Sequence, residues 1–264
     1  MSQIVQAWSL PPDLQTLAGD EVQVWHVSLA LSAAVIGTLR ELLSPAEQAR
    51  ADRFHFKIDC ERFTVARACL RIILGSYLQT DPAEIEFTYG EYGKPQLATV
   101  IEKSSQLKFN LAHSYSWALY AFTLGREIGV DIERIRPELA SEEIAKRFFS
   151  PLEVELLRRV PSHIRHEAFF NCWTCKEAFL KAKGVGLSLP LNEFDVTLGP
   201  LTPAVLLRTR GDEGEALRWS LQTIDLRPGY VGAIAVEGHD WRLSCWRPGD
   251  EFLTERCLHN TPVN

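Results

Sequence analysis

Two acidic side chains stand close together in an otherwise apolar stretch of the chain. The segment IGVDIE (residues 128–133) places Asp131 and Glu133 two positions apart on a predicted strand, so both point to the same face. Neighbouring carboxylates repel each other and are costly to desolvate unless a cation compensates them, and hard divalent cations prefer carboxylate oxygens. The spacing indicates either a metal site or an exposed strand edge.

A third acid lies on a predicted amphipathic helix. In WTCKEAFLK (residues 173–181), Glu177 and Lys181 are one helical turn apart and share a face. Glu177 could therefore serve as a third acid of a metal site. The two residues are equally compatible with an ion pair on the surface.

Small polar groups surround one histidine in NLAHSYS (residues 110–116). We expect a loop after a strand here, able to meet phosphate oxygens through Ser114, backbone amides and a protonated His113. The alternative is a histidine that only makes structural hydrogen bonds. The nearby GKP (residues 93–95) predicts a turn that displays Lys94.

The elements that must position these residues can be predicted from caps and periodicity. SPAE (residues 44–47) is a capping box with proline at the first helical position, and a second helix is expected from about Asp59 to Tyr77. Further helices are predicted over residues 141–149, 150–160 and 162–183. Strands are predicted over residues 85–89, 107–111, 117–124, 128–132, 194–198, 217–224, 230–236 and 241–246, with 125–127 closing a hairpin.

This order is not a regular alternation of strand and helix, and it predicts an α+β fold of two similar lobes. We expect an N-terminal lobe over residues 1–126, a C-terminal lobe over 127–249 and a loose tail over 250–264. The N-terminal lobe contains the basic segment and His113, and the C-terminal lobe contains the acidic residues.

Charge and composition exclude some classes of function. A formal net charge of −6 argues against a nucleic-acid binder. Seven basic residues between Arg40 and Arg71 could meet phosphate locally or form a solvated helix face. We expect no membrane span and no leader peptide, and therefore a cytoplasmic protein. The six cysteines, including the lone pair Cys172 and Cys175, are expected to be free thiols.

Read together and in order, these segments resemble the signature set of Sfp-type 4'-phosphopantetheinyl transferases. The resemblance rests on GKP (93–95), FNLAHS (109–114), GVDIE (129–133), AKRFFS (145–150), WTCKEAFLK (173–181) and GVGLSLPL (184–191). Each segment alone is weak, but their joint order is specific. Alanine at position 112 departs from the serine often found there and removes no ligand.

The resemblance implies a pseudo-twofold monomer with coenzyme A and Mg²⁺, or Mn²⁺, in the cleft between the lobes. Asp131, Glu133 and Glu177 match the metal ligands. Residues expected to contact coenzyme A are Arg50, Arg62, Lys94, His113, Ser114 and Lys181.

The implied reaction is attack by a serine hydroxyl of an apo acyl- or peptidyl-carrier protein on the β-phosphorus of coenzyme A. Lys181 would neutralise phosphoryl charge, and Glu177 or Glu133 would accept the proton. Phe148, Phe149, Lys146 and Arg147 are candidates for carrier docking, or simply core packing. Two other classes remain open: a non-catalytic coenzyme A or carrier binding module, and a Mg²⁺-dependent hydrolase of nucleotide diphosphates.

Overall fold

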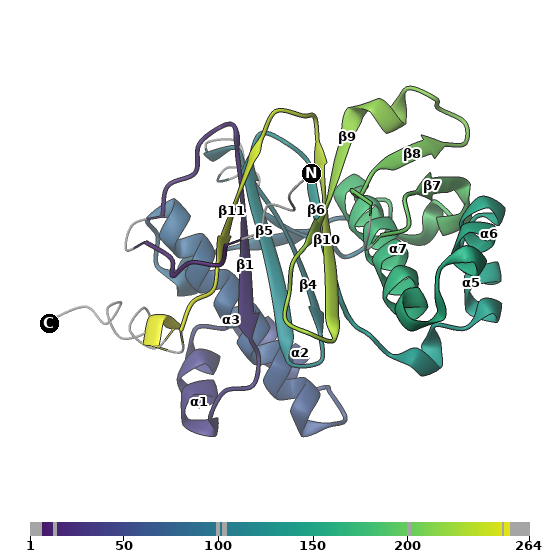
Figure 1. Cartoon of the computed structure of the whole chain (residues 1–264). Coiled ribbons are helices and arrows are strands. Elements are labelled where there is room, and N and C mark those ends of the chain that lie inside the picture. The colour runs from purple at the N-terminus through teal and green to yellow at the C-terminus, as the bar shows by residue number, and fades with distance from the viewer. Residues whose placement is uncertain are drawn as a thin grey trace, which may run out of the picture.

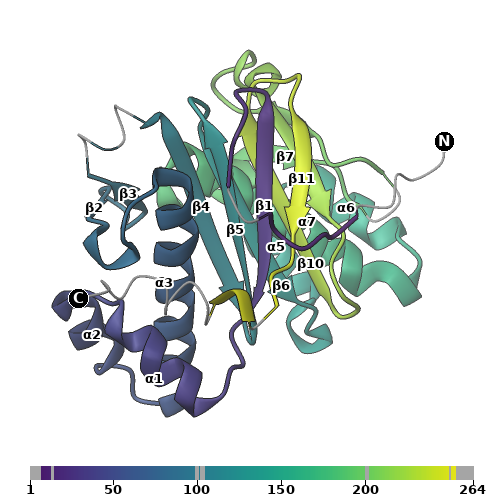
Figure 2. The same cartoon turned by 90° about the vertical axis from the view of Figure 1, so that its left-hand side faces the viewer.

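Two sheets lie between two groups of helices (Figure 1). The computed structural model describes residues 7–12, 15–98, 101, 105–199, 202–249 and 251–253. The first sheet has the order β11-β1-β5-β4, built from Arg242–Trp246, Glu21–Ser28, Trp117–Leu124 and Leu107–Ser114. Figure 2 shows these four strands side by side. The second sheet has the order β6-β10-β9, built from Ile128–Arg134, Tyr230–Glu237 and Trp219–Ile224.

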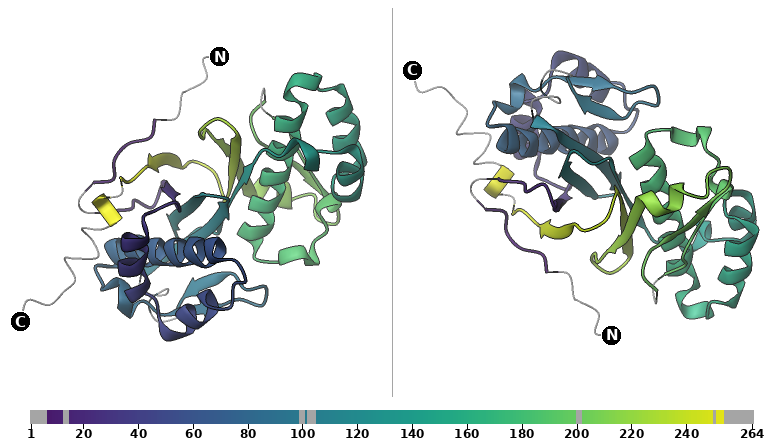
Figure 3. Two further views of the ribbon diagram at one scale, coloured as in Figure 1. Left: turned by 90° about the horizontal axis from the view of Figure 1, so that it is seen from below. Right: turned by 90° about the horizontal axis from the view of Figure 1, so that it is seen from above.

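The helices cover the outer faces of the sheets, as the views from below and above show (Figure 3). The first group comprises α1 (Ala33–Glu41), α2 (Pro45–Ala51) and α3 (Lys57–Leu78), and the second α5 (Glu142–Phe148), α6 (Pro151–Arg159) and α7 (Ser162–Lys183). Two short ribbons complete the structure, β2-β3 (Phe87–Tyr89, Pro95–Leu97) and β7-β8 (Phe194–Val196, Leu206–Thr209). No helix in the described part of the chain is long and apolar enough to cross a membrane.

The two lobes repeat one topology. In the first lobe the chain runs β1, α3, β4, β5 and pairs the strands as β1-β5-β4; in the second it runs β6, α7, β9, β10 and pairs them as β6-β10-β9. All four of these pairings are antiparallel. Both long helices, α3 and α7, have 22 residues. The predicted α+β fold of two similar lobes is therefore confirmed.

Three apolar clusters fill the layers. One lies between α3 and the first sheet around Trp25, Tyr120 and Phe122, and one surrounds α7 around Phe169 and Phe179. The third lies between the sheets and is built mainly from valine, isoleucine, leucine and alanine of β1, β5, β6 and β10. Because such burial dominates folding stability, the sheets are fixed to each other as firmly as to their helices.

Several local predictions are confirmed. The capping box of Ser44 and Glu47 starts α2, and a second box of Ser150 and Glu153 starts α6. α7 ends at Gly184, whose left-handed φ of 67° suits glycine. All described cysteines are free thiols, and Cys172 and Cys175 are buried in the core around α7. Burial raises the pKa of the Cys175 thiol to about 12, so the pair offers no reactive thiolate.

Other predictions were wrong. β5 and β6 do not form a hairpin, because both edges of β5 are occupied by β1 and β4, and β6 pairs with β10. The expected loop over residues 110–116 is mostly strand, since β4 stays paired with β5 as far as Ser114 and Trp117. β1, α1 and β8 were not predicted.

The C-terminal part of the chain returns to the first lobe. β11 pairs in parallel with β1, so this strand of the proposed C-terminal lobe belongs to the first sheet. Of the expected tail, Phe252 packs on Trp25 at 5.6 Å between ring centroids and Leu253 is buried. These three residues, 251–253, are therefore not loose. Residues 254–264 lie outside the described part.

A fully buried ion pair ties α7 to the rest of its lobe. Lys176 and Glu153 are both 0% exposed, with Nζ 2.8 Å from Oε1. Lys176 also donates to the Leu191 carbonyl at 2.8 Å, and Glu153 accepts from the backbone N–H groups of Ser150 and Val196. The pair joins α6, α7 and β7, and it fixes the helix turn that carries Glu177.

Lys176→Met should lower the free energy of unfolding by about 3–5 kcal/mol, because it leaves the buried Glu153 carboxylate without its cation. Lys146→Met, which breaks an exposed pair with Glu142, should cost about 1 kcal/mol or less. Urea unfolding of both variants measures the difference. Equal losses would show that the buried pair has no special role.

A buried histidine on β1 lies in a stack of rings and guanidinium groups. The His26 ring is 5.3 Å from Trp8 and 4.3 Å from Trp117, and Arg247 and Arg227 cover the outer tryptophan rings. Burial, with the charges of Arg247 and Arg227, lowers the pKa of His26 to about 3. The imidazole is therefore neutral in the folded protein at pH 7.

The unfolded chain protonates His26 near pH 6.5 and the folded chain only near pH 3, so acidification below pH 6.5 favours unfolding. We expect the free energy of unfolding to fall by about 1.4 kcal/mol per pH unit from this group. Chemical denaturation between pH 7 and pH 5 should give a flatter profile for His26→Gln. The exposed His239→Gln should keep the wild-type slope, and an unchanged slope in His26→Gln would refute the assignment.

Candidate active site at the junction of the lobes

Side chains rather than a backbone ladder join the two sheets at the candidate site. β4 and β6 belong to different sheets, yet the Val130 backbone N–H donates to Asn110 Oδ1 at 2.9 Å. Four residues further along each strand, the Arg134 N–H donates to Ser114 Oγ at 3.1 Å. Both contacts advance in the same direction along the two strands, so β4 and β6 run parallel at this seam.

Strand alternation decides which residues face the helices. On β4, Leu107 and Phe109 pack in the core under α3, so His113 shares their face. On β6, Gly129 faces α7, so Asp131 and Glu133 lie on the α7 side. The expected common face of the two acids is confirmed. This face lies on the α7 side of β6, next to the seam between β4 and β6.

Gly129 sets the distance between α7 and β6. A Cβ atom built on this residue would lie 2.0 Å from the Ala178 carbonyl oxygen and 2.3 Å from the Ala182 backbone nitrogen. Only glycine allows this approach. Because Glu177 and Lys181 precede these two alanines, the same contact carries them to the acids of β6.

The acids of β6 are held by specific partners. Lys181 Nζ lies 2.6 Å from Asp131 Oδ1, and Ser114 Oγ donates to Glu133 Oε2 at 2.8 Å. Arg136 Nη2 is 3.7 Å from the same oxygen of Glu133. Asp131 Oδ2 is buried and has no hydrogen-bond partner among the described residues.

Uncompensated negative charge remains at the site. Burial raises the pKa of Asp131 despite Lys181, and burial with repulsion from Asp131 raises the pKa values of Glu133 and Glu177. In the described residues, no three His, Cys, Asp or Glu side chains converge on one point as a formed metal site would require. The unpartnered oxygen and the mutual repulsion of three hard oxygen donors nevertheless fit a divalent cation.

Two adjacent cavities open on the seam and share Gly93, Pro95 and Leu111. The smaller, of about 290 Å³, contains Glu177 and Lys181 on one wall and Lys94 on another. The larger, of about 690 Å³, contains most of the remaining predicted residues: Arg50, Arg62, His113, Ser114 and Glu133. The structure thus brings these predicted residues to one region, where they are divided between the smaller and the larger cavity.

The larger cavity is cationic and has unused donors. Arg62 Nε and Arg136 Nε are buried without a hydrogen-bond partner in the part of the chain that the structure describes. Burial, with Lys181 and Arg62 nearby, lowers the pKa of His113, so the imidazole is neutral at pH 7 rather than protonated as expected from the sequence. An anion beside it would favour the protonated form.

Lys94 and Ser114 lie differently from the phosphate contacts expected of them. Lys94 Nζ donates to the carbonyl oxygens of Ile128 at 3.1 Å and Ala182 at 3.4 Å, in the smaller cavity. Ser114 is buried in the seam and bonds to β6, although it lines the larger cavity. Both residues join the lobes in addition to any role toward a ligand.

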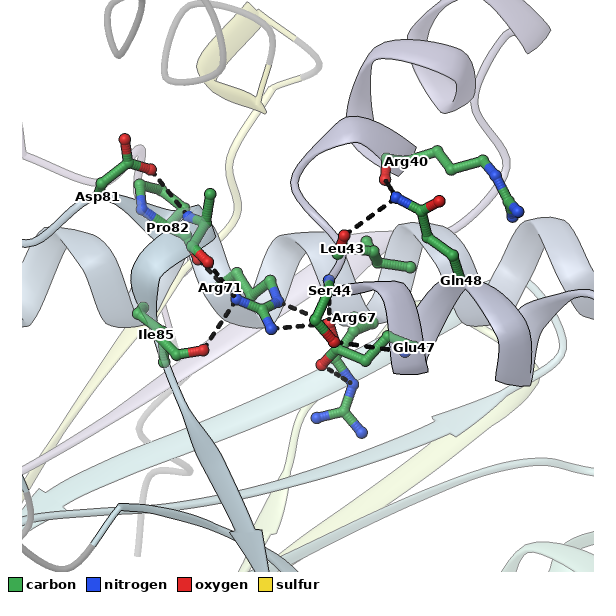
Figure 4. Close-up of polar contacts among 11 residues, drawn as sticks. Arg40, Leu43, Ser44, Glu47, Gln48, Arg67, Arg71, Asp81, Pro82 and Ile85 are labelled. Carbon is green, nitrogen blue, oxygen red and sulfur yellow. Dashed lines mark hydrogen bonds and ion pairs between the residues drawn. The ribbon is translucent and has the colours of Figure 1, made fainter.

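A buried network around Glu47 and Arg71 holds α2, the helix that carries the cavity-lining Arg50, against α3 (Figure 4). Glu47, in the first turn of α2, accepts from Arg71 Nε at 2.8 Å and lies 3.5 Å from Arg67 Nε. Arg71 also donates to the carbonyls of Pro82 and Ile85. The network fixes α2 on α3, and Arg50, one turn along α2, stacks over the Phe63 ring at 5.3 Å.

Sequence reasoning missed Arg67, Arg136 and Tyr115, all of which line the larger cavity. Arg67 was counted only as one of a run of basic residues, and Tyr115 only as part of an expected loop. The suggested docking residue Phe149 is 2% exposed and packs on Phe169, so it belongs to the core. Phe148 packs edge-on against Trp173.

Comparison with known proteins agrees with this geometry. The family model described as the 4'-phosphopantetheinyl transferase superfamily matches residues 127–235, and that described as 4'-phosphopantetheinyl transferase, N-terminal, matches residues 32–124. The two matches fall on either side of residue 126. The proposed lobe boundary there remains a prediction.

Named relatives belong to the same group. The 4'-phosphopantetheinyl transferase HetI of Nostoc sp. is 42% identical over 236 residues, which cover 89% of this chain and 95% of HetI. The 4'-phosphopantetheinyl transferase Sfp of Bacillus subtilis is 37% identical over 156 residues, covering 59% and 66%. Holo-[acyl-carrier-protein] synthase of Helicobacter pylori, solved with coenzyme A, is 22% identical with a TM-score of 0.33, covering 42% of this chain and 99% of that one.

Gly129→Ala should destabilise the protein by about 3 kcal/mol and separate α7 from β6, because the added methyl group meets backbone atoms that cannot turn aside. Gly37→Ala, on α1 with open space around it, should be neutral or stabilising by up to about 1 kcal/mol. Urea unfolding compares the two variants. A Gly129→Ala protein as stable as Gly37→Ala would contradict the close approach.

Proposed function

The chain belongs to the 4'-phosphopantetheinyl transferase superfamily, and from this premise we propose that it transfers the 4'-phosphopantetheine arm of coenzyme A to a serine of an apo acyl- or peptidyl-carrier protein. The products are the holo-carrier and 3',5'-ADP. The observation that carries the proposal is the meeting of Glu177 and Lys181 on α7 with Asp131 and Glu133 on β6, beside a cationic cavity.

The nucleotide half of coenzyme A suits the larger cavity. Its phosphates need several fixed cations, and Arg50, Arg62 and Arg136 line this space. The Nε donors of Arg62 and Arg136 are buried and have no hydrogen-bond partner among the described residues. His113 is neutral in the free protein and would gain a proton as a 3'-phosphate approached it. The cost of leaving these donors unused is recovered when the ligand binds.

The acidic side of the site suits the phosphoryl transfer itself. The carrier serine oxygen forms a bond to the β-phosphorus of coenzyme A while the bond from phosphorus to the oxygen of 3',5'-ADP breaks. Lys181 stabilises negative charge on the phosphoryl oxygens. Its contact with Asp131 keeps the ammonium group within the site before substrate binds.

Glu177 is the better candidate for the base that accepts the serine proton. The Glu133 carboxylate is engaged by Ser114 and Arg136, whereas no side-chain hydrogen bond or ion pair to the Glu177 carboxylate is found among the described residues. Burial and the neighbouring acids raise the pKa of Glu177, which makes its carboxylate a stronger base at neutral pH.

Asp131, Glu133 and Glu177 would hold Mg²⁺, or Mn²⁺, between them. A bound divalent ion would supply charge stabilisation and orientation for the pyrophosphate. The raised pKa values of the three acids, caused first by burial and, for Glu133 and Glu177, also by repulsion from Asp131, fit a site that a cation would stabilise. On the sequence grounds given above, the proposal extends to a monomer acting in the cytoplasm.

Incubation with coenzyme A, Mg²⁺ and a panel of apo-carrier proteins should increase the carrier mass by one phosphopantetheine, as measured by intact mass spectrometry. EDTA should abolish the gain, and Glu177→Gln should lower kcat by about 10²–10⁴-fold if Glu177 is the base. Glu143→Gln, an exposed acid on α5, serves as the matched control and should retain full activity.

Coenzyme A binding without transfer to any carrier would support the binding-module alternative. Release of 3',5'-ADP from coenzyme A in the absence of a carrier would support the hydrolase alternative. Activity that survives EDTA would refute the metal assignment but leave the transferase assignment in place.

A further inference from the structure

Tyr115 adopts a backbone conformation that disfavours its own side chain. It has φ 52° at the tip of the β4–β5 hairpin, whose last paired residues are Ser114 and Trp117. The other described non-glycine residues with positive φ are Gln79, Gln106 and Asp240, all smaller and unbranched. A bulky aromatic residue in the left-handed region costs free energy that glycine or asparagine would not.

Both neighbours of Tyr115 are fixed, so the hairpin cannot relax to relieve this cost. Ser114 bonds to Glu133 and to the Arg134 backbone across the seam. On the other side, the Ser116 carbonyl accepts from the Leu29 N–H at 2.8 Å. The tip therefore holds the Tyr115 ring in one place relative to both lobes.

The ring is not used as core packing. It is 39% exposed and lines the larger cavity together with Arg50, Arg62 and His113. Arg134 lies over the ring at 4.5 Å and Arg62 at 5.8 Å from its centroid. A half-exposed aromatic ring on a strained backbone, in contact with guanidinium groups and lining a cavity, is the arrangement expected of a ligand-binding residue rather than a stabilising one.

We propose that Tyr115 is a substrate-contacting residue that covers the nucleotide half of coenzyme A and holds Arg62 toward its phosphates. This rests on the proposed function for the identity of the ligand. Nucleobases stack on aromatic side chains with little dependence on sequence context, and guanidinium groups bind phosphate. A docking carrier protein is the competing occupant, but the ring shares its cavity with the cations that an anionic nucleotide requires.

The test separates strain from binding. Tyr115→Asn removes the ring and tolerates positive φ, so its melting temperature without ligand should be unchanged or higher by up to about 4 °C. Its Kd for adenosine 3',5'-bisphosphate, measured by isothermal titration calorimetry, should rise by roughly tenfold. Tyr115→Phe keeps the ring and should restore binding to within about threefold of the wild type.

Asp240→Gly is the matched control. It relieves positive φ, 58°, at an exposed turn, so it should alter the melting temperature in the same direction and leave nucleotide affinity unchanged. Equal affinity of Tyr115→Asn and wild type would overturn the proposal. So would a drop of more than about 4 °C in melting temperature, which would make the ring a packing element, or a raised KM for the carrier with unchanged nucleotide affinity.

Failure of the transferase assignment is distinguishable from failure of this inference, because nucleotide binding is measured without a carrier. If the wild type loads no carrier but Tyr115→Asn still weakens nucleotide binding, the contact stands and the reaction does not. If carriers are loaded and the variant binds nucleotide normally, the reaction stands and the contact does not. No measurable binding of the bisphosphate to the wild type would overturn the inference directly.

Discussion

The seam between β4 and β6 is the constraint on which the site depends. Two side chains, Asn110 and Ser114, take the place that backbone carbonyls would occupy in a continuous sheet. Asn110 satisfies the buried Val130 N–H of β6, which would otherwise be left without a partner at high cost, and Ser114 satisfies the partly buried Arg134 N–H. Because the strands are joined this way, they can diverge, and the cavities open where a continuous sheet would be closed.

The second requirement is that α7 lies very close to β6. Gly129 permits the approach, and the buried pair of Lys176 and Glu153 fixes the rotation of the helix. These two features explain why carboxylates from two elements crowd together in spite of their repulsion. The free energy of repulsion is small beside the apolar burial around α7, so packing holds the acids together. A site assembled by packing is ready for a cation without needing one to fold.

The sequence predicted most helices and strands and many residues of the candidate site. It failed for strand pairing and for site residues that only tertiary contacts bring to the cavity. Capping boxes and periodicity located α2, α6 and α7 because those signals are local. β1 was missed because its alternation of polar and apolar residues, EVQV then WHVS, changes phase at Trp25, and both of its faces are buried. Strand partners could not be predicted, since β5 and β6 are consecutive yet lie in different sheets. The acids, Lys181 and His113 were found from their types and spacing. Tyr115, Arg136 and Arg67 were not, because only the fold brings them to the cavity.

The two lobes contribute different sets of charged side chains to the space between them. Repetition of the same strand order gives each lobe an equivalent long helix, and the seam faces the two helices toward a shared space. The first lobe lines that space with Arg50, Arg62 and His113, and the second lines it with carboxylates and Lys181. A repeated scaffold thereby produces an asymmetric field, and under the proposed function the first lobe would bind phosphate and the second a cation. A molecule that carries phosphates at both ends of such a field is held in one orientation, which is what transfer from a defined phosphorus atom requires.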